Sequence, residues 1–288
     1  MALNITYILL AFTVSTSLFI RSRKLILCAT IITITSALLH EIINLESLLA
    51  ILLLFGLSYT YFSYGNLSRL LKTILFLIII LLITAFLIHI ILGFANSLVI
   101  DKERLSPLSC PFSMYLNFDK TIAALVIYIT SGLSILEKPV DKKSILYTTL
   151  YLSICAGFVS LLGILTGYIK FEPKLPDILP IWVLNNLLFV CMAEEVIFRG
   201  FVQTHLKKFL NEKTNFQTLH ITITSLIFGL AHFKGGVLYV ILASICGWFY
   251  GYAYERTNRI LCAMLVHFGL NLIHLTLFTY PVSTPGEN

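Results

Sequence analysis

The chain has 288 residues, of which 58% are hydrophobic and only 12% are Asp, Glu, Lys or Arg. An average soluble domain carries roughly 25% charged residues, so this composition excludes a soluble enzyme, a disulfide scaffold and a disordered chain. The 20 Lys and Arg exceed the 14 Asp and Glu, and most of these cations lie in short loops between apolar runs, as in membrane proteins. The sequence shows no nucleic-acid-binding motif. We therefore predict a polytopic membrane protein that binds no nucleic acid.

Ten apolar runs follow one another along the chain. They cover residues 2–20, 25–44, 47–65, 73–95, 121–136, 144–168, 181–203, 218–233, 237–253 and 260–279. A span of the lipid core takes about 20 helical residues. The nearly continuous Leu, Ile and Phe of these runs lack the alternation of barrel strands. The sequence predicts an all-α transmembrane bundle of about eight to ten helices.

The charges between the runs predict an orientation. Positive charges follow the run 2–20 instead of preceding it, so we interpret it as a retained span and not as a cleavable signal. Loops 21–24, 66–72, 137–143, 204–217 and 254–259 together hold 13 Lys and Arg, against 6 in the opposite set. This bias predicts that the basic loops are cytoplasmic and that both termini lie outside.

Two longer connections and a few isolated polar residues complete the first part of the chain. We expect residues 96–120 and the Pro-rich residues 170–180 to be outer connections, the second leading into a helix. His40 and Glu41 are expected at a span end, and His89 is expected to pack inside the fourth span with a backbone hydrogen bond. We interpret the scattered cysteines as buried free thiols. They are Cys28, Cys110, Cys155, Cys191, Cys246 and Cys262.

The first polar cluster inside an apolar run is AEEVIFRG, with Glu194, Glu195 and Arg199. Glu195 and Arg199 are four residues apart in the favourable order for an ion pair on one helix face. Successive helical residues point about 100° apart, so Glu194 projects elsewhere and is free for another role. The alternative is that both glutamates only tie the helix to its neighbours.

Two further clusters lie on later runs. FGLAH places Phe228 and His232 one helical turn apart, and HFGLNLIH places His267, Asn271 and His274 on one helix face. A histidine near a helix end can be a satisfied polar residue, and Asn and His can form an interhelical hydrogen-bond seam. His274 fits such a seam.

Depth in the membrane is compatible with convergence of these residues. At ~1.5 Å per residue, Glu194 lies about 13 Å from the inner end of its span, and His267 and Asn271 about 10 and 16 Å. His232 lies about 21 Å in, on the same rise per residue. We therefore expect the four to be able to meet near the middle of the bilayer.

Two kinds of chemistry fit such a set. A buried carboxylate can act as a base towards water, aided by one imidazole, while a second imidazole and a carboxamide stabilise an oxyanion. These roles describe hydrolysis of an acyl bond, most plausibly a peptide bond. Alternatively, Glu194, His232 and His267 are three ligands of a catalytic zinc with water in the fourth position. The spacing does not separate the two.

At these residues the chain resembles the CPBP family of intramembrane proteases, which includes the CAAX-processing Rce1-type enzymes and the Abi bacteriocin-immunity proteins. The family pattern is EExxxR, FxxxH and HxxxN on successive helices. This sequence has EEVIFR at 194–199, FGLAH at 228–232 and HFGLN at 267–271, and GWFYGYAYERTNRI at 247–260 is similar to the family's glycine-rich helix. The resemblance covers about residues 180–276.

The resemblance implies a glutamic endopeptidase without a cofactor. Glu194 and His232 would then activate water, and His267 and Asn271 would form the oxyanion site. Glu195 and Arg199 would mainly support the architecture.

The resemblance also implies an organisation and a setting. Residues 180–279 would form the protease domain, after N-terminal helices at 1–179 of unassigned role and before a short tail at 280–288. The expected partners are membrane lipid and a membrane-associated or lipidated protein substrate, in a bacterial inner membrane. Two other functions stay open: a non-proteolytic immunity or scaffold protein of the same fold, and a transporter, which lacks the expected inverted counterpart in the first half.

Overall fold

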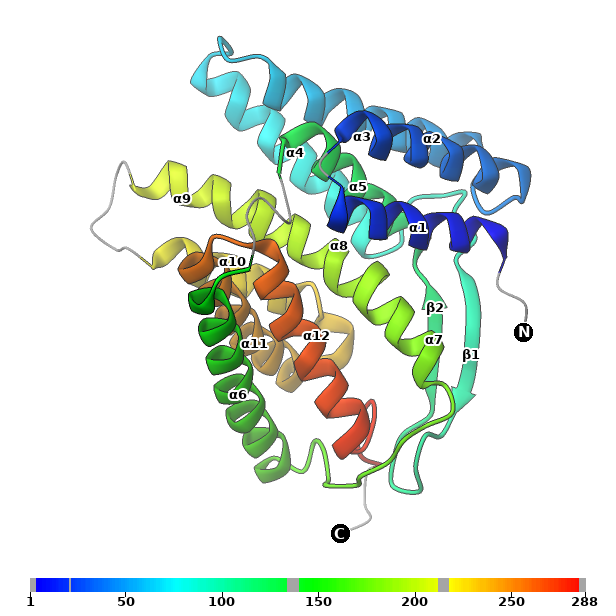
Figure 1. The fold of residues 1–288 in the computed structure, drawn as a ribbon, viewed down its shortest axis with the longest axis vertical. Helices are drawn as coiled ribbons and strands as arrows, with labels where there is room; N and C mark the ends of the chain where they lie inside the picture. Colours follow the sequence, from blue (N-terminus) through cyan, green and yellow to red (C-terminus); the bar gives the residue numbers. More distant parts are fainter. Residues whose placement is uncertain (1–3, 21, 134–139, 212–217, 285–288) are drawn as a thin grey trace. The chain divides into compact units, whose positions relative to one another are not determined.

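The computed structural model describes residues 4–20, 22–133, 140–211 and 218–284, and its helices follow the ten apolar runs (Figure 1). The first six are α1 (Ile5–Phe19), α2 (Arg23–Leu39), α3 (Leu45–Ser63), α4 (Arg69–Leu87), α5 (Phe118–Ser131) and α6 (Lys142–Leu165). After a long helix from Leu179 come α10 (Leu219–Leu230), the short 3-10 helix η3 (Phe233–Gly235), α11 (Gly236–Thr257) and α12 (Ile260–Leu277). Parts of the predicted loops 137–143 and 204–217 and of the predicted tail lie outside the described residues.

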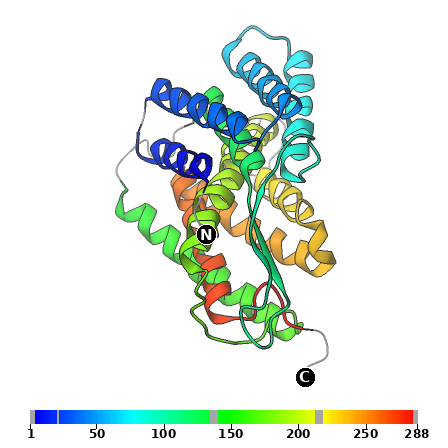
Figure 2. The same cartoon turned by 90° about the vertical axis from the view of Figure 1, so that its right-hand side faces the viewer.

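Within the described residues, six helical segments are long and apolar enough to cross a membrane. These are Leu45–Ser63, Arg69–Leu87, Lys142–Leu165, Leu179–Leu210, Phe233–Thr257 and Ile260–Leu277. The all-α polytopic fold is therefore confirmed. The sheet is small: β1 (Ser97–Glu103) and β2 (Phe112–Leu116) run side by side as a hairpin (Figures 1 and 2).

Local sequence explains where many helices begin. Five helices start after a residue whose side chain accepts a hydrogen bond from a backbone N–H of the first turn. These caps are Asn4, Ser22, Asn44, Ser68 and Asp141. The Pro-rich segment leads into a helix as predicted, with Pro180 in its first turn, where a missing N–H costs nothing. Polar residues that interrupt the apolar runs therefore mark the boundaries.

Several boundaries differ from the predicted ones, and three of them affect candidate polar residues. The fourth helix ends at Leu87, and His89 lies beyond it with a φ of 60°. Helix α5 begins at Phe118, so Asp119 and Lys120 belong to its first turn and not to an outer connection. Helix α10 ends at Leu230, before the FGLAH motif is complete. Hydropathy misplaced the start of α5 because charged residues in its first turn were taken for a loop. It misplaced the ends of α4 and α10 because apolar residues continue beyond these helices.

The long helix is continuous but not uniformly α-helical. It passes through α7 (Leu179–Leu184), the π-helical η1 (Asn185–Cys191), α8 (Met192–Glu195), the π-helical η2 (Val196–Gln203) and α9 (Thr204–Asn211). The two glutamates of the first motif occupy the short α8 segment between the two π-helical stretches. Such π-helical turns are rare and often occur at functional sites.

The chain forms two compact units. Unit 1 contains residues 1–97, 116–137 and 188–201, and unit 2 contains residues 98–115, 138–187 and 202–288. In unit 1, α5 is the core helix: it contacts α1, α2, α3, α4 and α8, and its residues from Phe118 to Tyr128 are buried. Helices α1 and α2 are joined by buried hydroxyl hydrogen bonds, such as Thr13 to Thr33 at 2.9 Å, which is the usual polar link between membrane helices.

In unit 2, α11 contacts α6, α10 and α12, and α12 also contacts α6. A Cβ at Gly229 of α10 would lie 2.6 Å from the carbonyl oxygen of Val240, so glycine is required for the close approach of α10 and α11. In the same unit, Ser109 pairs with Ser283 in an isolated β-bridge, and Thr284 donates a hydrogen bond to Leu108. Residues up to Thr284 are therefore held against the 106–110 loop.

Two smaller expectations are partly confirmed. His40 and Glu41 are exposed at the end of α2, as predicted. The cysteines are free thiols, and the four that are buried are Cys155, Cys191, Cys246 and Cys262. The prediction was wrong for Cys28, which is exposed, and for Cys110, which is half-buried. An apolar run does not tell which helix face points inward.

Candidate functional site

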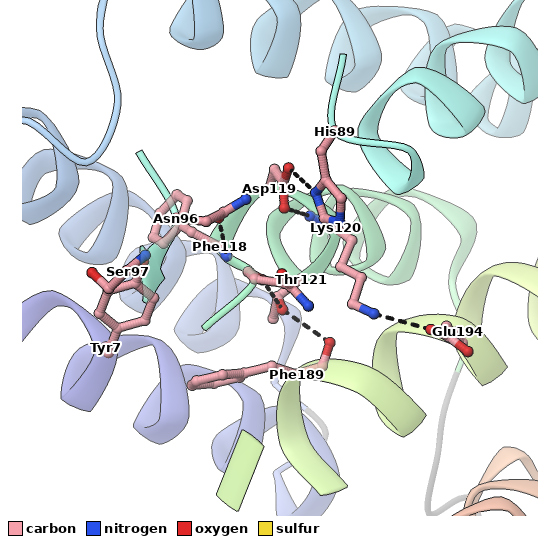
Figure 3. Close-up of polar contacts among 11 residues, drawn as sticks. Tyr7, His89, Asn96, Ser97, Phe118, Asp119, Lys120, Thr121, Phe189 and Glu194 are labelled. Atoms are coloured by element: carbon pink, nitrogen blue, oxygen red, sulfur yellow. Dashed lines mark hydrogen bonds and ion pairs between the residues drawn. The ribbon is translucent and has the colours of Figure 1, made fainter. Parts of the chain in front are cut away.

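Glu194 lies in α8 within unit 1 and forms an ion pair with Lys120. Its side chain is buried, with 7% of the residue exposed, and its Oε1 accepts a hydrogen bond from Lys120 Nζ at 3.0 Å (Figure 3). Glu194, which the sequence analysis left to project away from the Glu195–Arg199 pair, thus meets a cation from another helix. The partner comes from α5, which no local spacing rule connects to residue 194.

Lys120 is the site residue that the sequence reasoning missed. It was counted among the cations of an outer connection, but it is buried in the first turn of α5. The available signal was the pair Asp119–Lys120 directly before the apolar run TIAALVIYI. Opposite charges next to an apolar helix are compatible with a buried ionic site as well as with a loop.

Asp119 and His89 form a second polar contact on the same turn of α5. Asp119 is buried, and its Oδ2 lies 2.6 Å from His89 Nδ1 (Figure 3). Its Oδ1 accepts the backbone N–H of Lys120 at 2.8 Å. The prediction of a packed His89 with a backbone hydrogen bond was wrong, because the helix ends before it and its ring contacts a carboxylate.

A threonine ties α5 to the helix that carries Glu194. The hydroxyl of Thr121 lies 2.7 Å from the carbonyl oxygen of Asn117 and 3.2 Å from that of Phe189. Phe189 belongs to η1, one turn before Glu194. The contact between α5 and this helix is thus fixed by a hydrogen bond as well as by the ion pair.

Glu195 and Arg199 form the predicted i,i+4 ion pair. Arg199 Nε donates to Glu195 Oε2 at 2.9 Å, and both side chains are 0% exposed. The pairing is confirmed, although η2 replaces the regular α-helix that the spacing assumed.

In unit 2, His232 and His267 both contact the ring of Phe228. His232 lies beyond the end of α10, half-buried, and its Nδ1 is 2.8 Å from the carbonyl oxygen of Phe228. Ring centroids of Phe228 are 4.7 Å from His232 and 5.7 Å from His267. His267 is buried on α12 and stacks on Tyr250, with centroids 4.5 Å apart. The second and third motifs therefore lie together around one aromatic ring.

Asn271 lies one turn after His267 on α12. Its Nδ2 donates to Oδ1 of Asn186 at 3.2 Å, and Asn186 is itself buried. The sequence reasoning did not single out Asn186, although the pair NN at 185–186 interrupts an apolar run. His274 contacts the carbonyl oxygen of Thr279, just after the end of its own helix, at 3.1 Å, so this contact does not join two helices.

The predicted site residues are thus divided between the two units. Glu194, Glu195 and Arg199 belong to unit 1, whereas His232, His267 and Asn271 belong to unit 2. The structure brings the members of each set together.

A zinc ion bound by Glu194 would lie close to the Lys120 ammonium. Among the described residues, no group of three or more His, Cys, Asp and Glu side chains is placed to hold a metal ion. Independently, the Lys120 ammonium lies at hydrogen-bond distance from Glu194 Oε1. A divalent cation at that carboxylate would be repelled by the ammonium.

Taken together, these features define a multi-pass helical membrane protein with buried ionic groups and a histidine–asparagine cluster on its C-terminal helices. Buried ionisable residues in membrane helices are costly and usually functional.

Residues 176–273 match the family model described as type II CAAX prenyl endopeptidase Rce1-like. Over these residues the chain is similar to the CAAX protease family, and the resemblance drawn from the three motifs is confirmed. Searches among curated proteins and among solved structures found no match. With the six helices able to span a membrane, the family supports an integral membrane protease of CAAX type that acts on a protein substrate.

Proposed function

We propose that this protein is an intramembrane endopeptidase that hydrolyses a peptide bond of a membrane-associated or lipidated protein. Glu194 and His232 activate the attacking water. His267 and Asn271 stabilise the oxyanion. The observation that carries this proposal is the buried Glu194 carboxylate, held 3.0 Å from the Lys120 ammonium in an apolar helix. Buried charges in membrane helices are often functional, which supports a catalytic role for Glu194.

The proposed reaction uses only these side chains and water. Water loses a proton to the Glu194 carboxylate as its oxygen bonds to the carbonyl carbon, and His232 orients that water. The oxyanion accepts hydrogen bonds from His267 and Asn271. When the carbon–nitrogen bond breaks, the proton held by Glu194 passes to the leaving amine. A positioned acid–base contributes about 10²–10⁴-fold and an oxyanion donor about 10²–10³-fold.

We further propose that no metal takes part. The alternative is a zinc ion on Glu194, His232 and His267. The Lys120 ammonium beside Glu194 favours the metal-free reaction, because it already supplies a positive charge at that carboxylate. We expect cleavage to persist in a zinc chelator, and loss of cleavage that added zinc restores would favour the metal reaction.

The substrate and the location are proposed on coarser grounds. The matched family description names CAAX prenyl endopeptidases, so a lipidated protein is a candidate substrate, and membrane lipid is its expected surroundings. We place the protein in a bacterial inner membrane as an integral, multi-pass protein. Residues 180–279 are the proposed protease domain, after residues 1–179.

The test compares terminal peptides of membrane proteins from cells that produce the wild type or the Glu194→Ala variant at equal levels of folded protein. New terminal peptides that appear only with the wild type would establish proteolysis and identify the substrate. Glu46→Ala is the matched control, because Glu46 is an exposed acid in the first turn of α3. It should yield the same peptides as the wild type.

Two results would contradict the proposal. If Glu194→Ala still produces the peptides, Glu194 is not the base. If neither protein produces them and the variant keeps the cellular phenotype, an immunity or scaffold function is the better explanation.

A further inference from the structure

The polar network of unit 1 extends beyond the residues of the three motifs. Lys120, Asp119 and His89 all lie in the N-terminal part of the chain, outside the matched segment 176–273. In Figure 3 they form a connected set, and the Lys120 side chain leads from the start of α5 towards Glu194. We propose that Lys120 is a positioning residue that keeps the Glu194 carboxylate ionised and in place for catalysis. This inference rests on the proposed function of Glu194.

The Lys120 ammonium has an acidic neighbour in the sequence, Asp119, but forms its ion pair with Glu194. Asp119, its direct neighbour, is engaged on both oxygens: Oδ1 accepts the backbone N–H of Lys120, and Oδ2 contacts His89 Nδ1. The Lys120 ammonium is 3.0 Å from Glu194 Oε1, across 74 positions of sequence. The side chain thus bridges two helices at the carboxylate that the proposed reaction uses.

The adjacent glutamate has a cation on its own helix. Glu195 is neutralised by Arg199, four residues later. Four residues after Glu194 the chain has Phe198 instead of a cation, and the cation that pairs with Glu194 is Lys120 of α5. Neutralisation alone could have been achieved locally, whereas a partner from α5 also fixes the carboxylate relative to a second helix.

The start of α5 is anchored by hydrogen bonds on both sides of Lys120. The backbone N–H of Phe118 donates to Asn96 Oδ1 at 2.8 Å, and Thr121 contacts the Phe189 carbonyl oxygen at 3.2 Å. These contacts lie on either side of Lys120 and limit its movement. A long lysine side chain is otherwise flexible, so the anchoring makes it a defined support for Glu194.

The chemical consequence concerns the charge of Glu194. A carboxylate in an apolar surrounding tends to take up a proton and become neutral, and a neutral acid cannot take a proton from water. The ammonium opposes this protonation. A carboxylate offers about four lone-pair sites, so the bond to Lys120 through Oε1 is compatible with a water on the second oxygen.

The test uses two Lys120 variants and one matched lysine. Lys120→Gln keeps a hydrogen-bond donor without charge, and Lys120→Arg keeps the cation. Lys142→Gln is the control, because Lys142 is an exposed lysine in the first turn of α6. The first readout is infrared spectroscopy of purified protein in lipid, in which the Glu194 band is identified by its disappearance in Glu194→Gln. We expect a carboxylate band in the wild type, Lys120→Arg and Lys142→Gln, and a protonated carboxyl band in Lys120→Gln.

The second readout is the rate at which the substrate found by the terminal-peptide comparison is cleaved per folded molecule. We expect Lys120→Gln to lower kcat by about 100-fold, a typical value for loss of a positioned base, with KM unchanged. Lys120→Arg should retain most of the rate. If Lys120→Gln folds poorly, the double variant Lys120→Gln/Glu194→Gln shows whether an unmatched charge is the cause, and Lys120→Arg still gives both readouts.

The outcomes are distinguishable. If Glu194 stays a carboxylate in Lys120→Gln, or if its cleavage rate per folded molecule equals that of the wild type, the inference is wrong and Lys120 is architectural. If the infrared bands change as expected but the wild type cleaves no membrane protein, the proposed protease function fails. In that case Lys120 still keeps the Glu194 carboxylate ionised, but this charge does not serve proteolysis.

Discussion

The buried pair of Glu195 and Arg199 allows a quantitative test of the architecture. Both side chains are 0% exposed and their N–O distance is 2.9 Å. Replacing Arg199 by Met leaves the Glu195 carboxylate buried without that cation, which typically costs about 3–5 kcal/mol of the free energy of unfolding. Because folded proteins are stable by about 5–15 kcal/mol, this single change should remove a large share of the stability.

The double variant Glu195→Leu/Arg199→Met should behave differently from the single one. Replacing a buried ion pair by apolar residues of similar volume is often neutral or stabilising, by about 1–4 kcal/mol. We therefore expect the double variant to recover most of the stability lost in Arg199→Met. If the pair is architectural, the double variant should also keep its cleavage rate per folded molecule.

The assay is reversible unfolding in mixed micelles followed by circular dichroism. Lys207→Met is the control, because its ion pair with Glu255 is partly exposed, with 42% of the Lys207 side chain accessible. Such pairs contribute about 0–1 kcal/mol. The reasoning would be refuted if Arg199→Met lost no more stability than Lys207→Met, or if the double variant were as unstable as Arg199→Met.

Two further predictions concern packing and a helix cap. Gly229→Ala should destabilise the protein by about 1–3 kcal/mol, because its Cβ would lie 2.6 Å from the Val240 carbonyl oxygen. Gly56→Ala is the control and should not destabilise it, because a Cβ there has nothing within 4 Å. Equal thermal unfolding midpoints for the two variants would disprove the close approach of α10 and α11. Hydrogen bonds from Ser144 hold the pKa of the Asp141 carboxyl below its usual 3.8. The stabilisation of the folded state by this cap is therefore complete above about pH 3.8, the pKa of Asp141 in the unfolded chain. It is lost as the pH falls through the lower pKa that Asp141 has in the folded protein. The melting temperature of the wild type should fall in acid relative to that of Asp141→Asn, because the asparagine amide caps the helix without changing its charge. Parallel plots of melting temperature against pH for the two proteins would contradict this prediction.

The fold class followed from the sequence because the bilayer leaves few solutions. Backbone groups in lipid must be hydrogen-bonded within the span, so every long apolar run became a helix. The ends were less predictable: Lys120 and Asp119 were assigned to a connection, although they form the first turn of α5. A hydropathy pattern does not distinguish a charged helical turn that is buried against protein from a loop.

What the sequence determined about the site by itself is local. The Glu195–Arg199 pair depends on the rise and turn of one helix, and the motifs EEVIFR, FGLAH and HFGLN are each contained within a few residues. For the same reason the family could be identified from short segments that lie in order along the chain.

Tertiary structure alone decided the partners that come from other helices. The Lys120 ammonium at Glu194, the Asn186 amide at Asn271 and the His89 ring at Asp119 are separated by 74, 85 and 30 positions. No periodicity relates such residues, because the distance between two helices depends on how all the side chains between them pack. The identity of the proposed catalytic glutamate could therefore be inferred from its motif, but the cation that holds it became visible only when α5 was packed against α8.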